Sequence, residues 1–183
     1  MHRVAGVGVA LVAALAVGVL VGPAAAAAPA GGPIELWASA GNNGSQHIVF
    51  VGAVGDYGTA VNVNKNGKPN PNGNYVKVRL KKGTFMIDTT AVNKAISSQQ
   101  EHPQVGSHAT CSAAFTVSAP VTFGKGTGLY KGISGTANVT LTFGGVGSRY
   151  TSGPKKGQCK QGGQSPRSSF GFVTGQGTVS FAS

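Results

Sequence analysis

The chain has 183 residues, of which 30 are glycine, and its 15 lysine and arginine residues outnumber four acidic residues, giving a formal net charge of +11 at pH 7. With four carboxylates, the chain has few residues that could form a catalytic carboxylate pair or an oxygen-ligated metal site. The length fits one domain with a core of its own.

The first segment has the pattern of a secretory signal. Arg3 supplies a positive charge, residues 4–21 are apolar and uncharged, and small residues at 24–28 offer A-x-A cleavage sites. A membrane anchor is the alternative, but three glycines dilute the apolar stretch and no charged flank follows it. We expect a signal peptide over 1–28 and a single secreted β-domain over 29–183, without a lipid or C-terminal anchor.

Short segments of alternating hydrophobicity, separated by Gly, Pro and Asn, predict an all-β fold, either an antiparallel β-barrel or a sandwich. The first strands are expected, in chain order, at 34–38, 47–54, 57–64, 75–81 and 84–87. The apolar run at 47–54 lacks alternation, which predicts burial on both faces or a place at a barrel seam. The Asn- and Gly-rich loop at 65–74 predicts that the strands on either side of it pair as a hairpin.

The middle of the chain holds the one expected helix, over 90–98, with Asp88 or Thr89 as its N-cap. Loops are expected at 97–109 and 144–168. Cys111 and Cys159 are the only cysteines. In an exported chain such a widely spaced pair predicts a structural disulfide, whereas a redox-active pair is usually spaced C-x-x-C.

The remaining strands are expected at 113–123, 137–143 and near the C-terminus. Pro120 cannot donate to a strand ladder, so it indicates an edge or a bulge. Near the C-terminus, Phe170 and Phe172 lie on one parity and Val179 and Phe181 on the other. This shift predicts a bulge at the Gly-Gln-Gly step, residues 175–177.

Residues 124–136 contain closely spaced glycines, which permit positive φ and tight backbone approach, with Tyr130 and Ile133 able to pack beneath the turn. The segment resembles the G-T-G-x-Y-x-G-I-x-G-T hairpin of secreted β-barrels similar to the dirigent and allene oxide cyclase families. With G-D-Y-G at 55–58 and Y-T-S-G at 150–153, the order of elements is also similar to a group of small secreted bacterial proteins of unknown function. The resemblance implies a barrel, and no catalytic residue of those families maps onto this sequence.

Catalytic patterns are not found in the sequence. It has no G-x-S-x-G elbow and no S-x-x-K with its partner motifs. A paired-carboxylate glycosidase would draw on Glu35, Asp56, Asp88 or Glu101. Asp56 lies in a turn, Asp88 precedes a helix and Glu101 lies in a polar loop, so these three have a structural explanation. We expect no catalytic residue and no cofactor.

Glu101, His102 and His108 form the one cluster of histidine and carboxylate residues. Their spacing matches no helix-borne H-x-x-x-H pattern and no zinc-finger pattern. We therefore expect solvated loop residues there and no metal site.

Basic residues fall into two groups, one on the solvent side of 75–81 and its turn and one in the loop at 144–168. The candidates for binding an anionic surface are Lys77, Arg79, Lys81, Lys82, Lys155, Lys156, Lys160 and Arg167. Such a charge draws a domain to anionic polymers or lipid surfaces of the cell envelope. The alternative is a charged face that only keeps the domain soluble and protects strand edges. Specific nucleic-acid recognition is not expected, because Phe115, Phe123 and Phe143 take inward strand positions.

Two functions fit these residues. The first is a secreted, non-catalytic β-domain that associates with anionic cell-envelope surfaces. The second is a barrel that binds a small apolar ligand in its interior, as a carrier or with a dirigent- or cyclase-like activity that needs no cofactor. Hydrophobic patterning does not decide between them, because interior volume depends on strand number and shear.

Overall fold

The computed structural model describes residues 30–39, 45–101, 104–160 and 166–182, so the expected signal peptide at 1–28 lies outside the described residues. The described chain is mostly β-structure, as its alternating segments predict. Its elements are β1 (Gly32–Ser39), β2 (Gln46–Gly52), β3 (Asp56–Val63), β4 (Tyr75–Leu80), β5 (Gly83–Asp88), α1 (Thr90–Glu101), β6 (Val105–Ser107), β7 (Ser112–Gly124), the 3₁₀ helix η1 (Gly128–Tyr130), β8 (Ile133–Val146) and β9 (Ser168–Phe181).

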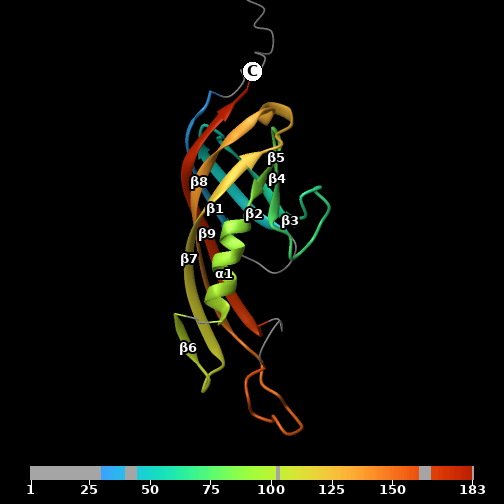
Figure 1. Ribbon diagram of the computed structural model, residues 1–183, viewed down its shortest axis with the longest axis vertical. Coiled ribbons are helices and arrows are strands. Elements are labelled where there is room, and N and C mark those ends of the chain that lie inside the picture. The colour runs from blue at the N-terminus through green and yellow to red at the C-terminus, as the bar shows by residue number, and fades with distance from the viewer. Residues whose placement is uncertain (1–29, 40–44, 102–103, 161–165, 183) are drawn as a thin grey trace, which may run out of the picture.

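Eight of these strands form a closed antiparallel barrel in the order β5-β4-β3-β2-β1-β9-β8-β7. The pair β3–β4, joined by the loop at 65–74, is the hairpin that the sequence predicted. Three residue pairs between β5 and β7, from Met86↔Gly124 to Asp88↔Thr122, close the ring. The barrel occupies the upper half of the molecule, and β7, β8 and β9 continue below it (Figure 1).

Four aromatic rings fill the upper end of the barrel. Phe85 lies at their centre and makes edge-to-face contacts with Phe50, Phe123 and Tyr130, with ring centroids 5.4 to 5.9 Å apart. Such tilted arrangements are favourable beyond simple burial of area. The interior of this end is therefore a packed side-chain core.

The lower end is a stem formed by the extensions of β7, β8 and β9, against which α1 packs (Figure 1). Val92 of α1 is buried in the same core cluster as Phe50 and Phe85 of the barrel. Below that cluster, Phe115 of β7 stacks on Phe143 of β8 with centroids 5.4 Å apart. The helix is longer than the expected 90–98, and β6 occupies part of the expected loop at 97–109. Likewise, β8 extends into the expected loop at 144–168.

Pro120 lies on a stretch of β7 that has a strand on one side only, which agrees with the expected edge position. On its second side β7 pairs with β6 and β5 only at its two ends. Between them, the Thr116 N–H donates to the Gln104 side chain rather than to β8. N–H directions repeat every second residue along a strand, so the nitrogen of Pro120 faces the same side of β7 as the Thr116 N–H. No described strand pairs with β7 on that side at Pro120, so the absent N–H costs no ladder hydrogen bond.

The prediction for 47–54 was wrong, because β2 alternates in the structure. Ile48 and Phe50 are buried, whereas Val49 is 44% exposed and Val51 is 42% exposed. The strand lies in the barrel wall, and its outer face has no described layer over it. The apolar run therefore places valines on the surface.

The predicted bulge at residues 175–177 is also wrong. β9 pairs with β1 and with β8 in continuous register through these residues. Phe170, 75% exposed, and Phe172 face outward, while Val179 faces the core. The change of parity thus reflects aromatic residues on the outer face rather than a switch of phase in the strand.

The glycine-rich hairpin between β7 and β8 has the tight geometry that its sequence predicted. A Cβ on Gly126 would lie 1.6 Å from the Tyr130 carbonyl oxygen, so no larger residue fits there. Gly128 and Gly132 have φ of 61° and 72°. Tyr130 and Ile133 are buried beneath the turn, as expected.

Candidate functional site

Residues 148–160, in the connection between β8 and β9, form a small hairpin of their own at the lower tip of the molecule (Figure 1). Tyr150 N–H donates to the Gln158 carbonyl (3.0 Å), and Gly157 N–H donates to the Tyr150 carbonyl (2.9 Å). A bridge between Arg149 and Cys159 continues the pairing. We call residues 148–160 the basic loop.

The predicted disulfide between Cys111 and Cys159 is present, with a Cα–Cα distance of 5.4 Å. It joins the basic loop to the turn between β6 and β7. Arg149 reinforces the junction, because its guanidinium donates to the carbonyl oxygens of Gly157 in the loop and Ala109 in the turn. The basic loop is therefore fixed at one end by a covalent bond and by charge-assisted hydrogen bonds.

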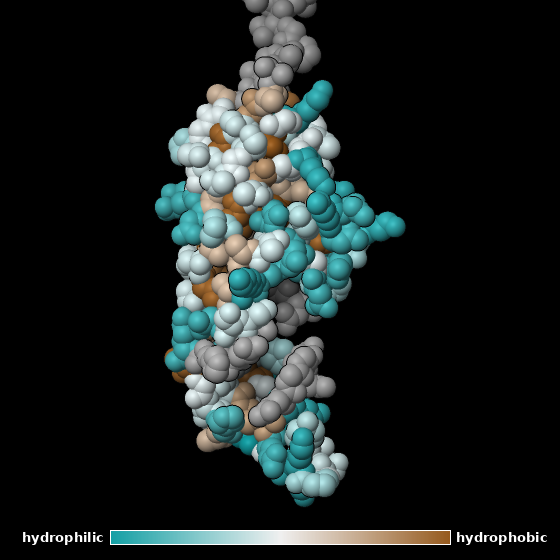
Figure 2. Space-filling view, viewed as in Figure 1, coloured by the Kyte–Doolittle hydropathy of each residue, from teal (hydrophilic) through white to brown (hydrophobic). Residues whose placement is uncertain are grey.

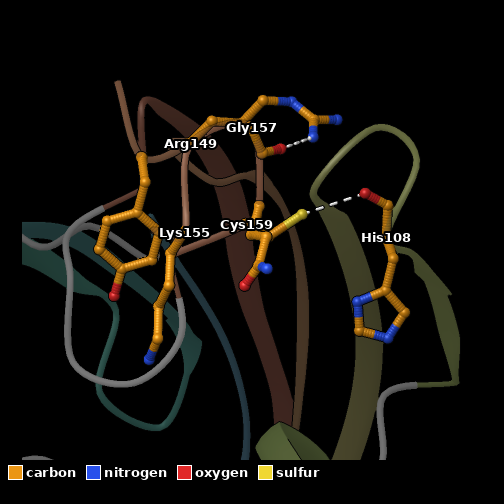
Figure 3. Close-up of a pocket in the computed structure, with 7 residues that line it drawn as sticks. His108, Arg149, Lys155, Gly157 and Cys159 are labelled. Carbon is orange, nitrogen blue, oxygen red and sulfur yellow. Dashed lines mark hydrogen bonds between the residues drawn. The ribbon is translucent and has the colours of Figure 1, made fainter. Parts of the chain in front are cut away.

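A pocket of about 380 Å³ opens between the basic loop and the β6–β7 turn. Figure 3 shows Arg149 and Lys155 on the loop side and His108 on the turn side, with Cys159 between them. The ammonium groups of Lys155 and Lys160 lie 5.9 and 5.8 Å from the centroid of the Tyr150 ring. Cations at this distance are attracted to the face of an aromatic ring.

The charge in this pocket is not neutralised by any described carboxylate. Its described lining residues include no acid. Asp56 is buried at the upper end of the barrel, Asp88 caps α1, and Glu35 lies on the outer face of β1. Among the described residues no ion pair is formed, so Lys155 and Lys160 keep their charge available to a ligand.

The strand group of basic residues lies on a different surface. Lys77 and Arg79 point outward along β4 as predicted, and Lys81, at the start of the β4–β5 turn, lies 5.5 Å from the Tyr57 ring centroid. Lys82 belongs to the β4–β5 turn, where its ammonium donates to the Gly55 carbonyl. Hydrophilic side chains gather on the β3–β4 side and again at the lower tip (Figure 2).

The structure therefore divides the eight candidates between two distant surfaces. Lys155, Lys156 and Lys160 lie in the basic loop, whereas Arg167 lies at the base of β9, where its N–H donates to the Val146 carbonyl. The topology separates them, because β4 belongs to the barrel and the loop caps the stem (Figure 1).

Asp56 has a structural role at the upper end of the barrel. Its carboxylate accepts hydrogen bonds from Tyr130 Oη (2.6 Å) and from the N–H groups of Lys82 (2.9 Å) and Tyr57 (2.8 Å). Burial raises the pKa of Asp56, but these hydrogen bonds outweigh burial and hold that pKa below its usual range. Burial and the neighbouring Asp56 carboxylate raise the pKa of Tyr130. The hydrogen bonds of Asp56 therefore connect the β2–β3 turn, the β4–β5 turn and the β7–β8 hairpin.

The two predicted alternatives share the cap of α1. Thr89 takes the N-cap backbone position, because its carbonyl accepts from the Asn93 N–H (2.9 Å), and Asp88 supplies the side-chain hydrogen bonds. Asp88 Oδ1 accepts from the Thr90 N–H (2.9 Å) and the Thr90 hydroxyl (2.6 Å). The Thr90 hydroxyl is the main cause that lowers the pKa of Asp88, in spite of partial burial.

The expected histidine cluster cannot be assembled from described side chains, because His102 and the Glu101 side chain lie outside the described residues. His108 lines the basic pocket, and both cysteines are used in the disulfide. Within the described part of the chain, no group of three His, Cys, Asp or Glu residues is placed to hold a metal ion.

Sequence reasoning missed Arg149, Tyr150 and Gln158 as members of the site. The signal that could have found two of them is the pair Arg149-Tyr150 in a lysine-rich loop next to a cysteine, since lysines, an arginine and an aromatic ring often combine on anion-binding surfaces. The link to His108 needed the three-dimensional structure.

The fold and the site together define a disulfide-linked antiparallel β-barrel with a cationic loop at one tip. None of the described helices is long and apolar enough to cross a membrane. Comparisons with models of known protein families, with curated proteins and with solved structures find no match. The resemblance to dirigent-like barrels therefore rests on the sequence motifs.

Proposed function

We propose that the protein is a secreted, non-catalytic binding domain that attaches to anionic polymers of the cell envelope through its basic loop. The observation that carries the proposal is the pocket beside Tyr150, where Arg149, Lys155 and His108 meet and no described carboxylate lies among them. The disulfide supports an oxidising, extracytoplasmic setting.

The chemistry of the pocket favours phosphodiester oxygens. Lys155, which lines the pocket, and Lys160, beside it, each hold an ammonium donor near the Tyr150 ring, which limits their motion. The guanidinium of Arg149 contributes charge while it holds the loop and the β6–β7 turn together. Because the loop is ordered before a ligand arrives, less conformational entropy is lost on binding.

The upper end of the barrel offers less support for the alternative function. Phe50, Phe85, Phe123 and Tyr130 occupy its interior, where a small apolar ligand would have to lie. The pocket at the basic loop and the groove over β1, β9 and β8 both open on the outer surface. These two openings support binding at the outer surface.

The test compares two variants with the same change of charge. One replaces Lys155, Lys156 and Lys160 by glutamine, and the other replaces Lys77, Arg79 and Lys81 by glutamine. Binding to immobilised poly(glycerol phosphate) is measured against neutral dextran over a series of salt concentrations. The wild type should bind the phosphate polymer and not the dextran, with an affinity that falls steeply as the salt concentration rises.

We expect the basic-loop variant to lose at least roughly tenfold in affinity and the strand variant less than about threefold, since local charges outweigh distant screened ones. Equal losses in both variants would show that only net charge matters, which would contradict a site at the loop. Absence of binding by the wild type at low salt would overturn the proposed function.

A further inference from the structure

A second pocket, a groove of about 440 Å³, lies on the outer face of the barrel across β1, β9 and β8. Two rows of outward side chains form it. The first row consists of Glu35, Gln176 and Asn138, which are direct cross-strand neighbours. The second row, two residues along each strand, consists of Trp37, Thr174 and Thr140.

The polar groups of this groove are only partly used within the protein. Gln176 Nε2 donates to Glu35 Oε1 at 3.4 Å, and the Thr140 hydroxyl pairs with that of Ser118. Trp37 Nε1, the Thr174 hydroxyl and the Asn138 amide have no hydrogen-bond partner among the described residues. The groove thus offers amide, carboxylate and hydroxyl groups beside an exposed indole ring.

We propose that this groove binds a neutral, β-linked, gluco-configured saccharide chain that stacks on Trp37. All ring substituents of a β-linked pyranose of this configuration are equatorial, so its two faces carry only C–H groups and fit flat against an indole. Trp37 is 44% exposed and can present its ring to such a face. The two rows lie about 7 Å apart along the strands, which places the amides and the carboxylate beside the hydroxyls at the rim of the sugar ring.

The charge of the groove argues for a neutral ligand. Among the described residues that line it, Glu35 is the one ionisable side chain, and none is a lysine or an arginine. A phosphate or a uronic acid would be repelled by this carboxylate, whereas sugar hydroxyls donate to it. This site lies on another surface from the basic loop and does not depend on the function proposed for that loop.

Trp37 is the sole tryptophan of the chain, so its fluorescence reports directly on this groove. The experiment titrates the full secreted domain with cellotetraose and with chitotetraose. We expect a saturable change in emission with at least one of them. The apparent affinity should change less than about twofold between low and high salt, because the probes are uncharged.

Variants at the groove sharpen the test. Gln176→Ala and Asn138→Ala should each weaken binding about fivefold, as expected for one lost hydrogen bond. Thr178→Ala, which alters the next outward position of β9, should change binding less than about twofold and serves as the matched control. Trp37→Ala, followed by calorimetry, should weaken binding at least roughly tenfold, and circular dichroism checks that it folds.

Three outcomes would overturn the proposal. The first is no saturable change with either saccharide. The second is equal affinity in Gln176→Ala, Asn138→Ala and Thr178→Ala. The third is a dimer in sedimentation whose formation shifts Trp37 emission, which would show that a second copy covers the groove. Loss of phosphate-polymer binding in the basic-loop variant with intact saccharide binding separates this site from the loop.

Discussion

Strands β7, β8 and β9 run through both ends of the molecule, but the two ends are stabilised in different ways. At the upper end, Phe85 and its neighbours pack inside a closed ring of strands. At the lower end, the chain beyond Phe115 and Phe143 is held by a disulfide and by the hydrogen bonds of Arg149. Burial of apolar area secures the first end, and a covalent bond secures the second.

This difference separates stability from binding. The upper end holds the buried Asp56, whose hydrogen bonds are all satisfied internally, so it has little to offer a ligand. The basic loop exposes its lysines and needs no core, because Cys159 fixes its position. A loop held in this way can carry a dense positive charge without a cost to core packing.

The largest effect is expected at the centre of the upper core. Phe85→Ala removes a fully buried ring that three other rings contact, and should lower the free energy of unfolding by about 3–5 kcal/mol. Phe170→Ala, at a ring that is 75% exposed, is the control and should cost less than about 0.5 kcal/mol. Urea denaturation measures both. Similar losses in the two variants would contradict the distinction between core and surface rings.

The sequence predicted strands well where alternation was strict. In β7 the inward residues from Phe115 to Phe123 are buried, as their parity indicated. Errors arose where apolar residues lie on the outer face, as at Val49 and Phe170. Alternation shows that two faces differ, but it does not show which faces are left exposed. That information requires the strand order around the barrel.

The candidate sites were predicted only in part. The lysines of the basic loop and the disulfide follow from composition and compartment. Their separation from Lys77 and Arg79 does not, because it depends on how far β7 and β8 extend beyond the barrel. The groove at Trp37 was not predicted from the sequence. The alternation in β1 contained a signal for it, because inward Ile34 and Leu36 place Glu35 and Trp37 on the outer face. A bulge at 175–177 would have put Thr174 and Gln176 on different faces of the sheet, so the expected bulge prevented recognition of β9 as part of the groove.

An intermediate effect is expected from the disulfide. Replacing Cys111 and Cys159 by serine should lower the free energy of unfolding by about 2–4 kcal/mol, because the cross-link no longer restricts the unfolded chain. Hydrogen exchange should show the amides of the basic loop losing protection, while those of β3 and β4 stay protected in the native state. Equal loss of protection at both ends would show that the two ends unfold as one unit.

The smallest of the three stability effects concerns the buried pair at the upper end. Tyr130→Phe removes the hydroxyl that donates to Asp56 and should lower the free energy of unfolding by about 2 kcal/mol at neutral pH. Tyr57→Phe, whose side chain is 59% exposed, should have almost no effect. Thermal denaturation of the two variants beside the wild type gives the comparison.

The pH dependence of Tyr130→Phe tests the cause. The pKa of Asp56 lies below its ordinary value of 3.8 in the folded protein, so its contribution to stability is present above that value and is lost as the pH falls through the folded pKa. Without the Tyr130 hydroxyl, burial acts with less opposition and raises the pKa of Asp56. The acid loss of stability should therefore begin at a higher pH in the variant. Parallel pH profiles would show that the hydroxyl contributes packing alone.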